Sequence, residues 1–383
     1  MQASGKRTYL DYAAAAPIRK EVTEVMESWS RDHFANPSAI YHEAEEAKKA
    51  LEEARSTIAR ILGVKASEVV FVSGSTEANN LAILGFARRS FSEGGYIITT
   101  QIEHASILEP VRVLESEGWK VSRLSVSQEG FVNLEELKNT EPTLVTLAWA
   151  NSDIGVIQPI QEIKKAIGGA TFHIDASQAG GLLDLKSASR VADLLTVSSS
   201  KIGGPRGVAA LIVRLETKLE PLIYGGGQER QLRSGTENVL YSIGFAKALE
   251  LAEKERARES ERLTILRDKL IKEILDSIKD AVLTGPKKER LANHASFAFE
   301  NIDGEELVIR LDERGFAVGT GSACLSAGQA GATNDYEVAP AVKALNLSPE
   351  FERGTLRVTL GRETREEDID NFVRALENLS QRR

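Results

Sequence analysis

Apolar residues along the first two-thirds of the chain follow two patterns, one helical and one typical of buried strands. In residues 43–62, alanine, leucine and isoleucine recur at helical spacing, and Gly63 follows where that helix would end. Helical stretches at 107–117 and 160–167 separate short apolar runs. The expected strands are 69–72, 96–100, 121–124, 144–148, 171–174, 194–197 and 208–213. Apolar strands between helices predict an α/β fold with a mostly parallel sheet that helices cover on both faces.

The final third of the chain has a different pattern. A long, charged and helix-periodic segment at 241–278 precedes short strands and helices in mixed order. The expected strands are 295–299, 316–318 and 355–360, and the expected helices are 305–313, 336–345 and 365–379. We therefore expect a large domain at 16–250 and a smaller α+β domain made of 1–15 and 251–383. The long helix contains no Pro/Gly linker, so the two domains are expected to pack as one rigid unit.

Composition narrows the class of protein. The chain has 383 residues, a net charge of −8 and one cysteine, Cys324, which excludes an internal disulfide and a multi-cysteine zinc site. The acidic balance argues against a nucleic-acid surface. No apolar stretch approaches the roughly 20 residues of a membrane span, and no signal peptide is evident, so a cytoplasmic protein is expected. The histidines show no metal-binding spacing, and no metal is expected.

Three segments at the ends of expected strands carry candidate chemistry. Ser75 and Thr76 stand between a strand and a helix start, where backbone N–H groups and hydroxyls bind phosphate, although a plain helix cap fits equally well. Asp175 ends one strand, and alone it is better read as a helix cap. Lys201 follows another strand and could form a Schiff base with an aldehyde cofactor, although most lysines lie on the surface.

The combination of these segments is more specific than each segment alone. Pyridoxal phosphate needs a lysine for its aldehyde, a carboxylate for its pyridinium N–H and a cradle for its phosphate. Lys201, Asp175 and the Ser75–Thr76 turn could supply these groups, with Ser198 and Ser200 as further hydroxyls. His104, after the strand at 96–100, could stack on the ring and move protons. The sequence therefore predicts a pyridoxal-phosphate site.

The order of motifs resembles the cysteine desulfurases of the NifS/IscS type, in the class V aminotransferase group. The resemblance covers essentially the whole chain. Its motifs, in order, are Tyr9 to Ala14, Asn36 to Ser38, Ser73 to Ile83 (SGSTEANNLAI), Glu103-His104, Asp175 to Gln178, Lys201, Arg233 to Thr236 (RSGT), Gly321 to Cys324 (GSAC), and Leu356-Arg357 with Gly361-Arg362.

The resemblance implies a role for each matching position. Lys201 carries the cofactor, Asp175 and Gln178 contact its ring, and His104 acts as acid and base. The phosphate is bound by Ser75, Thr76, Ser198 and Ser200, joined by Thr236 from the other subunit of a homodimer. Arg357 holds the substrate carboxylate, with Asn36, Asn151 and Ser152 nearby. Cys324 is the nucleophile that takes sulfur from L-cysteine as a persulfide.

The chain departs from the family pattern at several of these positions. Ser152 stands where the family has a second asparagine, Ser200 where it has histidine, and Ala15-Ala16 where it has two threonines. Small residues around Cys324 favour a reactive cysteine on an exposed loop, whereas a buried, inert cysteine is the alternative. A selenocysteine lyase, another class V reaction and a cofactor-binding scaffold without turnover stay open. Because no second cysteine is present, the persulfide sulfur is expected to pass to an external acceptor, such as an iron–sulfur scaffold or a tRNA-thiolation protein.

Overall fold

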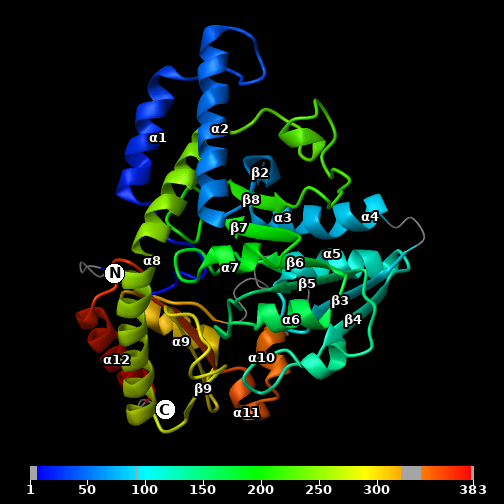
Figure 1. The fold of residues 1–383 in the computed structure, drawn as a ribbon. Coiled ribbons are helices and arrows are strands. Elements are labelled where there is room, and N and C mark those ends of the chain that lie inside the picture. Colours follow the sequence, from blue (N-terminus) through cyan, green and yellow to red (C-terminus); the bar gives the residue numbers. More distant parts are fainter. Residues whose placement is uncertain (1–6, 91–93, 321–337, 381–383) are drawn as a thin grey trace.

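A seven-stranded sheet forms the centre of the larger part of the molecule (Figure 1). The computed structural model describes residues 7–90, 94–320 and 338–380. Strand β8 pairs antiparallel with both of its neighbours, and the other pairs in the sheet are parallel. This arrangement confirms the mostly parallel α/β sheet. In spatial order the strands are β2 (Val69–Val72), β8 (Ala209–Val213), β7 (Leu194–Ser198), β6 (Thr171–Asp175), β5 (Leu144–Ala148), β3 (Tyr96–Thr100) and β4 (Lys120–Leu124).

Both faces of this sheet are buried. Successive side chains of a strand point to opposite faces, so Val69 and Phe71 join one hydrophobic cluster while Val70 and Val72 join another. The first cluster includes side chains from α2 (His42–Leu62), α6 (Ile160–Ala166) and α7 (Leu185–Ser189). The second includes side chains from α3 (Ser75–Asn80), α4 (Phe86–Ser90) and α5 (Ala105–Ser116). Apolar runs without alternation, such as the one in β2, are the sequence signature of such two-sided burial.

The helix expected after Thr76 is interrupted in its middle. A π-helical turn at Leu81–Gly85 joins α3 to α4. A Cβ on Gly85 would lie 2.6 Å from the carbonyl oxygen of Glu220, so only glycine allows this close approach. The first part of the helix, which carries Ser75 and Thr76, is separated from the end of β2 by two residues.

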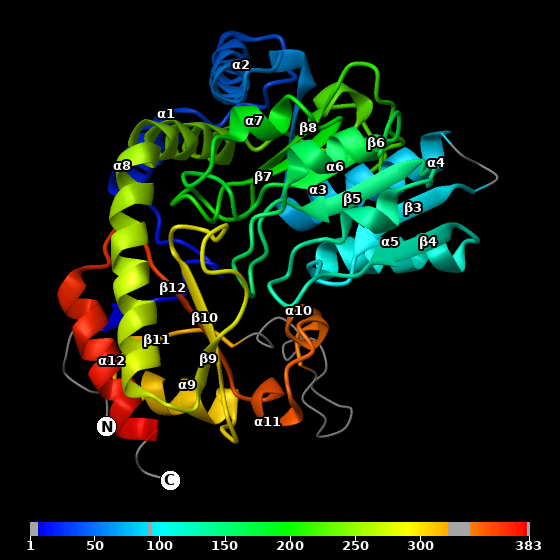
Figure 2. The same ribbon diagram turned by 60° about the horizontal axis from the view of Figure 1, so that its bottom comes forward.

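A second, smaller core surrounds a three-stranded antiparallel sheet (Figure 2). Strand β10 (His294–Phe299) lies between β9 (Ala281–Leu283) and β12 (Thr355–Thr359). Helices α9 (Gly304–Asp312) and α12 (Glu366–Ser380) contribute apolar side chains to this core. Strand β1 (Thr8–Tyr9) pairs in parallel with β11 (Phe316–Ala317), and Leu10 is buried in the same core.

Helix α8 (Val239–Ser277) belongs to both cores. Phe245 and Leu249 pack in the core of the large sheet, whereas Leu266 and Leu270 pack in the smaller core. One continuous helix therefore connects the two parts, as its uninterrupted sequence indicated. The division of the chain at residue 250 stays a prediction, which these two clusters support.

The structure corrects several of the expected boundaries. The helix expected at 336–345 is α10 (Pro340–Ala344), because Pro340 is suited to a first helical position; Tyr336 lies outside the described residues. Helices α1 (Lys20–Asp32) and α11 (Pro349–Glu352), and strands β1 and β9, were not expected. The two strands are too short to give a periodic signal. In the described ranges, no helix is long and apolar enough to cross a membrane.

Candidate active site

A cleft of about 400 Å³ opens at the carboxyl ends of β5, β6 and β7, where open α/β sheets bind ligands. Most of the predicted site residues line it, although they come from distant parts of the sequence. These residues are Ser75, Thr76, His104, Asn151, Ser152, Asp175, Gln178, Ser198, Ser200, Lys201 and Arg357.

Two of the predicted residues that the structure describes do not line this cleft. Asn36 and Thr236 are exposed side chains that do not line it. The Asn36 side chain instead accepts a hydrogen bond from the Ser38 N–H at 2.9 Å. Cys324 lies outside the described residues. The roles assigned to these three residues, like the roles of the residues that line the cleft, stay predictions.

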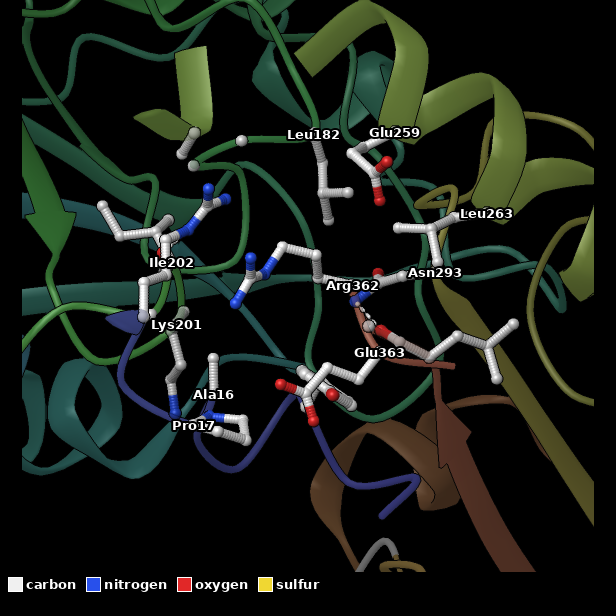
Figure 3. Close-up of a pocket in the computed structure, with 18 of the residues that line it drawn as sticks. Ala16, Pro17, Leu182, Lys201, Ile202, Glu259, Leu263, Asn293, Arg362 and Glu363 are labelled. Carbon is white, nitrogen blue, oxygen red and sulfur yellow. Dashed lines mark hydrogen bonds between the residues drawn. The ribbon is translucent and has the colours of Figure 1, made fainter. Parts of the chain in front are cut away.

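Lys201 lies between two cavities. Its Nζ donates a hydrogen bond to the carbonyl of Ala14 at 2.5 Å, in the segment that follows β1. Lys201 and Gln178 also line a second, smaller cavity of about 90 Å³. Leu263 and Arg362 are among its other lining residues (Figure 3). Gln178 donates to the carbonyl of Ala13 at 3.0 Å. The segment that follows β1 therefore holds the side chains of Lys201 and Gln178 in place beside the cleft.

Asp175 is a buried carboxylate fixed at the end of β6. Ser177 donates to its Oδ1 from both the backbone N–H, at 2.9 Å, and the hydroxyl, at 2.5 Å. The Asn79 amide donates to its Oδ2 at 2.8 Å. These bonds hold the carboxylate in one orientation at the wall of the cleft.

Several hydroxyl groups line the cleft. Ser75 is the first residue of α3, and the Ser198 and Ser200 hydroxyl oxygens lie 3.2 Å apart. Arg206, an exposed residue in the loop after Lys201, also lines the cleft. The sequence analysis missed this arginine, although its place in the same loop as Lys201 was a usable signal. Hydroxyls and helix N–H groups beside a cation form a donor set that fits a phosphate.

His104 caps the N-terminus of α5 through its ring. The Ser106 N–H donates to His104 Nδ1 at 3.1 Å, and the Ser106 hydroxyl lies 2.8 Å from the same nitrogen. The preceding residue, Glu103, is buried and accepts hydrogen bonds from the Thr100 hydroxyl at 2.6 Å and from the Ala148 N–H at 2.7 Å. Burial raises the pKa of Glu103 to about 8. The sequence analysis assigned no role to Glu103.

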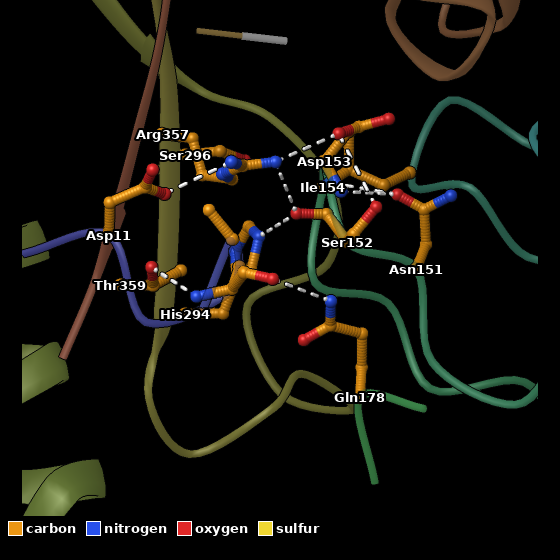
Figure 4. Close-up of polar contacts among 12 residues, drawn as sticks. Asp11, Asn151, Ser152, Asp153, Ile154, Gln178, His294, Ser296, Arg357 and Thr359 are labelled. Carbon is orange, nitrogen blue, oxygen red and sulfur yellow. Dashed lines mark hydrogen bonds and ion pairs between the residues drawn. The ribbon is translucent and has the colours of Figure 1, made fainter. Parts of the chain in front are cut away.

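Arg357, on β12, lies between two carboxylates (Figure 4). Its Nη2 donates to Asp11 at 3.0 Å and its Nη1 to Asp153 at 3.2 Å. Burial raises the pKa of Asp153, and the positive charge of Arg357 opposes that rise. The carboxylates of Asp11 and Asp153 were not foreseen as partners, because each is more than 200 residues from Arg357 along the chain.

Ser152, where the family pattern has asparagine, takes part in the polar contacts of the site through its backbone carbonyl. The Ser152 carbonyl accepts hydrogen bonds from His294 Nε2 at 2.8 Å and from Arg357 at 3.4 Å (Figure 4). Burial lowers the pKa of His294 well below its usual value, so its ring is neutral and Nε2–H is the donor. Asn151 is buried, and its amide donates to the carbonyl of Ile102 at 2.6 Å.

The donor set of the cleft fits pyridoxal phosphate. It places an amine at Lys201 for the aldehyde, a carboxylate at Asp175 for the ring nitrogen, and hydroxyls at Ser75 and Ser198 for the phosphate. The structure thus brings together the groups that this cofactor requires.

Comparison with known proteins identifies the family. Residues 8–372 match the aminotransferase class-V family, and the chain belongs to that family. A cysteine desulfurase IscS of Dictyoglomus turgidum is 42% identical over 379 residues, which cover 98% of this chain and 94% of that protein. Cysteine desulfurase IscS 1 of Archaeoglobus fulgidus is 39% identical over 378 residues, covering 98% of this chain and 97% of that protein.

Solved structures show the same likeness. A NifS-like protein superposes with a TM-score of 0.89 at 31% identity, covering 97% of this chain and 99% of that one. SspA in complex with cysteine superposes with a TM-score of 0.79 at 33% identity, covering 92% and 98%. These findings confirm the family resemblance, the fold class and pyridoxal phosphate as the cofactor.

Proposed function

We propose that this protein is a pyridoxal-phosphate-dependent cysteine desulfurase that converts L-cysteine to L-alanine. The observation that carries the proposal is the convergence of Lys201, Asp175, His104 and Arg357 on one cleft. The relatives named cysteine desulfurase, which match almost the whole chain, support it. A structural relative in complex with cysteine supports the substrate.

Each residue has a distinct role in the proposed reaction. Lys201 would hold the cofactor aldehyde, and its Nζ would move a proton of the substrate. Asp175 holds the ring nitrogen, and His104 exchanges a proton at its ring. The cofactor supplies an electron sink for the negative charge that develops at the substrate Cα. Arg357 orients the substrate carboxylate. To do so, its guanidinium has to exchange its hydrogen bonds with Asp11 and Asp153 for hydrogen bonds with the substrate.

The sulfur would pass to Cys324. As a thiolate, Cys324 attacks the substrate sulfur; the Cβ–S bond breaks, an S–S bond forms, and a proton takes the place of sulfur on the alanine product. Because the chain has one cysteine, the persulfide sulfur leaves to an external thiol. A sulfur-acceptor protein is therefore part of the proposal, with an iron–sulfur scaffold or a tRNA-thiolation protein as its class.

A homodimer and a cytoplasmic location belong to the same proposal. Thr236 is exposed and lies outside the cleft of its own chain, which supports a contribution to the phosphate site of a second subunit. Asn36 is assigned to the substrate, and residues 1–15 and 251–383 to the smaller domain.

Alanine release from L-cysteine, measured with a reductant present, tests the activity. We expect the wild type to show the visible absorption of bound pyridoxal phosphate and to release alanine. Cys324→Ser should keep the absorption and lose alanine release, and Lys201→Ala should lose both. Lys138→Ala, which changes an exposed lysine paired with Glu135, is the matched control.

Other outcomes would point to the alternatives. Alanine release by Cys324→Ser at the wild-type rate would contradict the persulfide step and favour direct transfer of the substrate sulfur to the added reductant. Turnover of selenocysteine alone would favour a selenocysteine lyase, and exchange between amino and keto acids an aminotransferase. If the protein binds the cofactor but forms no product, the result would favour a cofactor-binding scaffold without turnover.

A further inference from the structure

A buried amide connects two residues of the active site, Asp175 and His104. Asn79, on α3, is fully buried, and its Nδ2 donates to Asp175 Oδ2 at 2.8 Å and to Ser106 Oγ at 2.9 Å. Ser106 is buried too, and its hydroxyl lies 2.8 Å from His104 Nδ1. A continuous row of hydrogen bonds therefore leads from Asp175 through Asn79 and Ser106 to His104.

The direction of each hydrogen bond in this row is fixed by its chemistry. An ionised carboxylate only accepts, so the amide nitrogen of Asn79, and not its oxygen, faces Asp175. The other amide hydrogen goes to Ser106 Oγ, which leaves the hydroxyl hydrogen of Ser106 for His104 Nδ1. The backbone N–H of Ser106 also donates to Nδ1, at 3.1 Å. A nitrogen that accepts from both donors carries no hydrogen, so the proton of the His104 ring lies on Nε2.

The orientation of the Asn79 amide destabilises the folded protein, which supports a functional role for this residue. Its Oδ1 is buried and has no hydrogen-bond partner among the described residues. A buried acceptor without a donor destabilises the folded protein, and leucine, of similar size, would avoid that loss. The amide stands where its nitrogen reaches both Asp175 and Ser106, which is the kind of site at which proteins retain an unfavourable group.

We infer that Asn79 and Ser106 are positioning residues that hold the Asp175 carboxylate and fix His104 in its Nε2–H tautomer. The catalytic consequence rests on the proposed function: His104 enters the reaction with a proton to donate at Nε2. The same row joins this tautomer to the carboxylate that holds the cofactor ring, so both are set before substrate arrives.

The tautomer is measured directly by NMR of the ring nitrogens in the full-length chain loaded with pyridoxal phosphate and labelled with ¹⁵N-histidine. His104→Gln assigns the His104 signals. We expect an unprotonated Nδ1 and a protonated Nε2 in the wild type. Ser106→Ala removes the hydroxyl donor and should shift the Nδ1 resonance and populate the second tautomer, whereas Ser106→Thr keeps the hydroxyl and should keep the wild-type signals. Ser116→Ala, an exposed serine at the other end of α5 that bonds to Val113, is the matched control.

Kinetics give the second measurement. Ser106→Ala and Asn79→Ala are expected to lower kcat for alanine release by about tenfold or more, with a much smaller change in KM. If the ring-nitrogen signals of His104 are unchanged in both Ser106→Ala and Asn79→Ala, the role inferred for Asn79 and Ser106 is wrong. The NMR measurement needs no turnover. A chain that binds the cofactor but releases no alanine would contradict the proposed function, and the NMR signals would still test the role of Asn79 and Ser106.

Discussion

Glu103 shows how one buried side chain makes stability depend on pH. In the unfolded chain a glutamate ionises near pH 4.3, whereas burial raises the pKa of Glu103 to about 8 in the folded protein. Between these values the folded state binds more protons than the unfolded state. The free energy of unfolding therefore falls as pH rises through this window, by up to about 1.4 kcal/mol per pH unit. The contribution of Glu103 is fully present below about pH 4.

Glu103→Gln should remove this contribution, because an uncharged amide keeps the shape and can still bond to Thr100 and Ala148. We expect the variant to lose less stability than the wild type between pH 5 and pH 8, in urea unfolding measured at a series of pH values. Glu109→Gln, an exposed glutamate on α5, should follow the wild type. Parallel pH curves for Glu103→Gln and the wild type would show that the group is ionised throughout.

At the scale of elements, a buried ion pair attaches α2 to the turn at Glu229–Gln231. Arg55 donates to both carboxylate oxygens of Glu229, at 2.7 and 2.8 Å, and the N–H of Phe71 donates to the same carboxylate at 2.8 Å. All three residues of the turn have positive φ, which costs conformational energy in residues other than glycine. The ion pair therefore holds a strained turn that leads into the segment carrying Thr236.

Removing one partner of this pair leaves the other as a buried, unpaired charge. Arg55→Ala is expected to lower the free energy of unfolding by about 3–5 kcal/mol. Arg60→Ala, on the same helix, breaks an exposed pair with Glu250 and should cost at most about 1 kcal/mol. Urea denaturation of the two variants beside the wild type measures the difference, and equal losses would contradict the role given to Glu229.

At the scale of the whole molecule, Thr236 raises the question of whether each cleft is completed by a second chain. Co-expression of a Lys201→Ala chain with a Thr236→Asp chain, each with its own tag, allows the mixed dimer to be purified. If Thr236 acts on the partner's phosphate site, the mixed dimer has one site with both defects and one with neither. It should then show about half of the wild-type activity.

A control dimer, and the result expected if Thr236 acts within its own chain, complete the experiment. A mixed dimer of wild type and Lys201→Ala should also show about half of the wild-type activity. If Thr236 acts within its own chain, both sites of the first mixed dimer are defective and its activity stays at the level of the single variants. A chain that sediments as a monomer would remove the need for Thr236 in trans altogether.

Much of the large sheet could be predicted because its strands are apolar on both faces. Strands β2, β3 and β5 have the expected bounds, and the cleft at the carboxyl ends of β5, β6 and β7 follows from the parallel pairing of those three strands. Pairings across long sequence separations could not be predicted, as with Arg357 and its partners Asp11 and Asp153. The elevated pKa of Glu103 likewise depends on burial that only the folded chain provides.

The pairing of β1 with β11, and of Asp11 with Arg357, sets an order of events during synthesis. Asp11 and Arg357 are 346 residues apart, so at ordinary translation rates roughly 20–70 s pass between their emergence from the ribosome. The large sheet contains neither strand and can form within that interval. The smaller core can form only near the end of translation. The same is true of the site at Arg357 that would bind a substrate carboxylate. A nascent chain would therefore hold cofactor-binding groups before it could bind an amino acid.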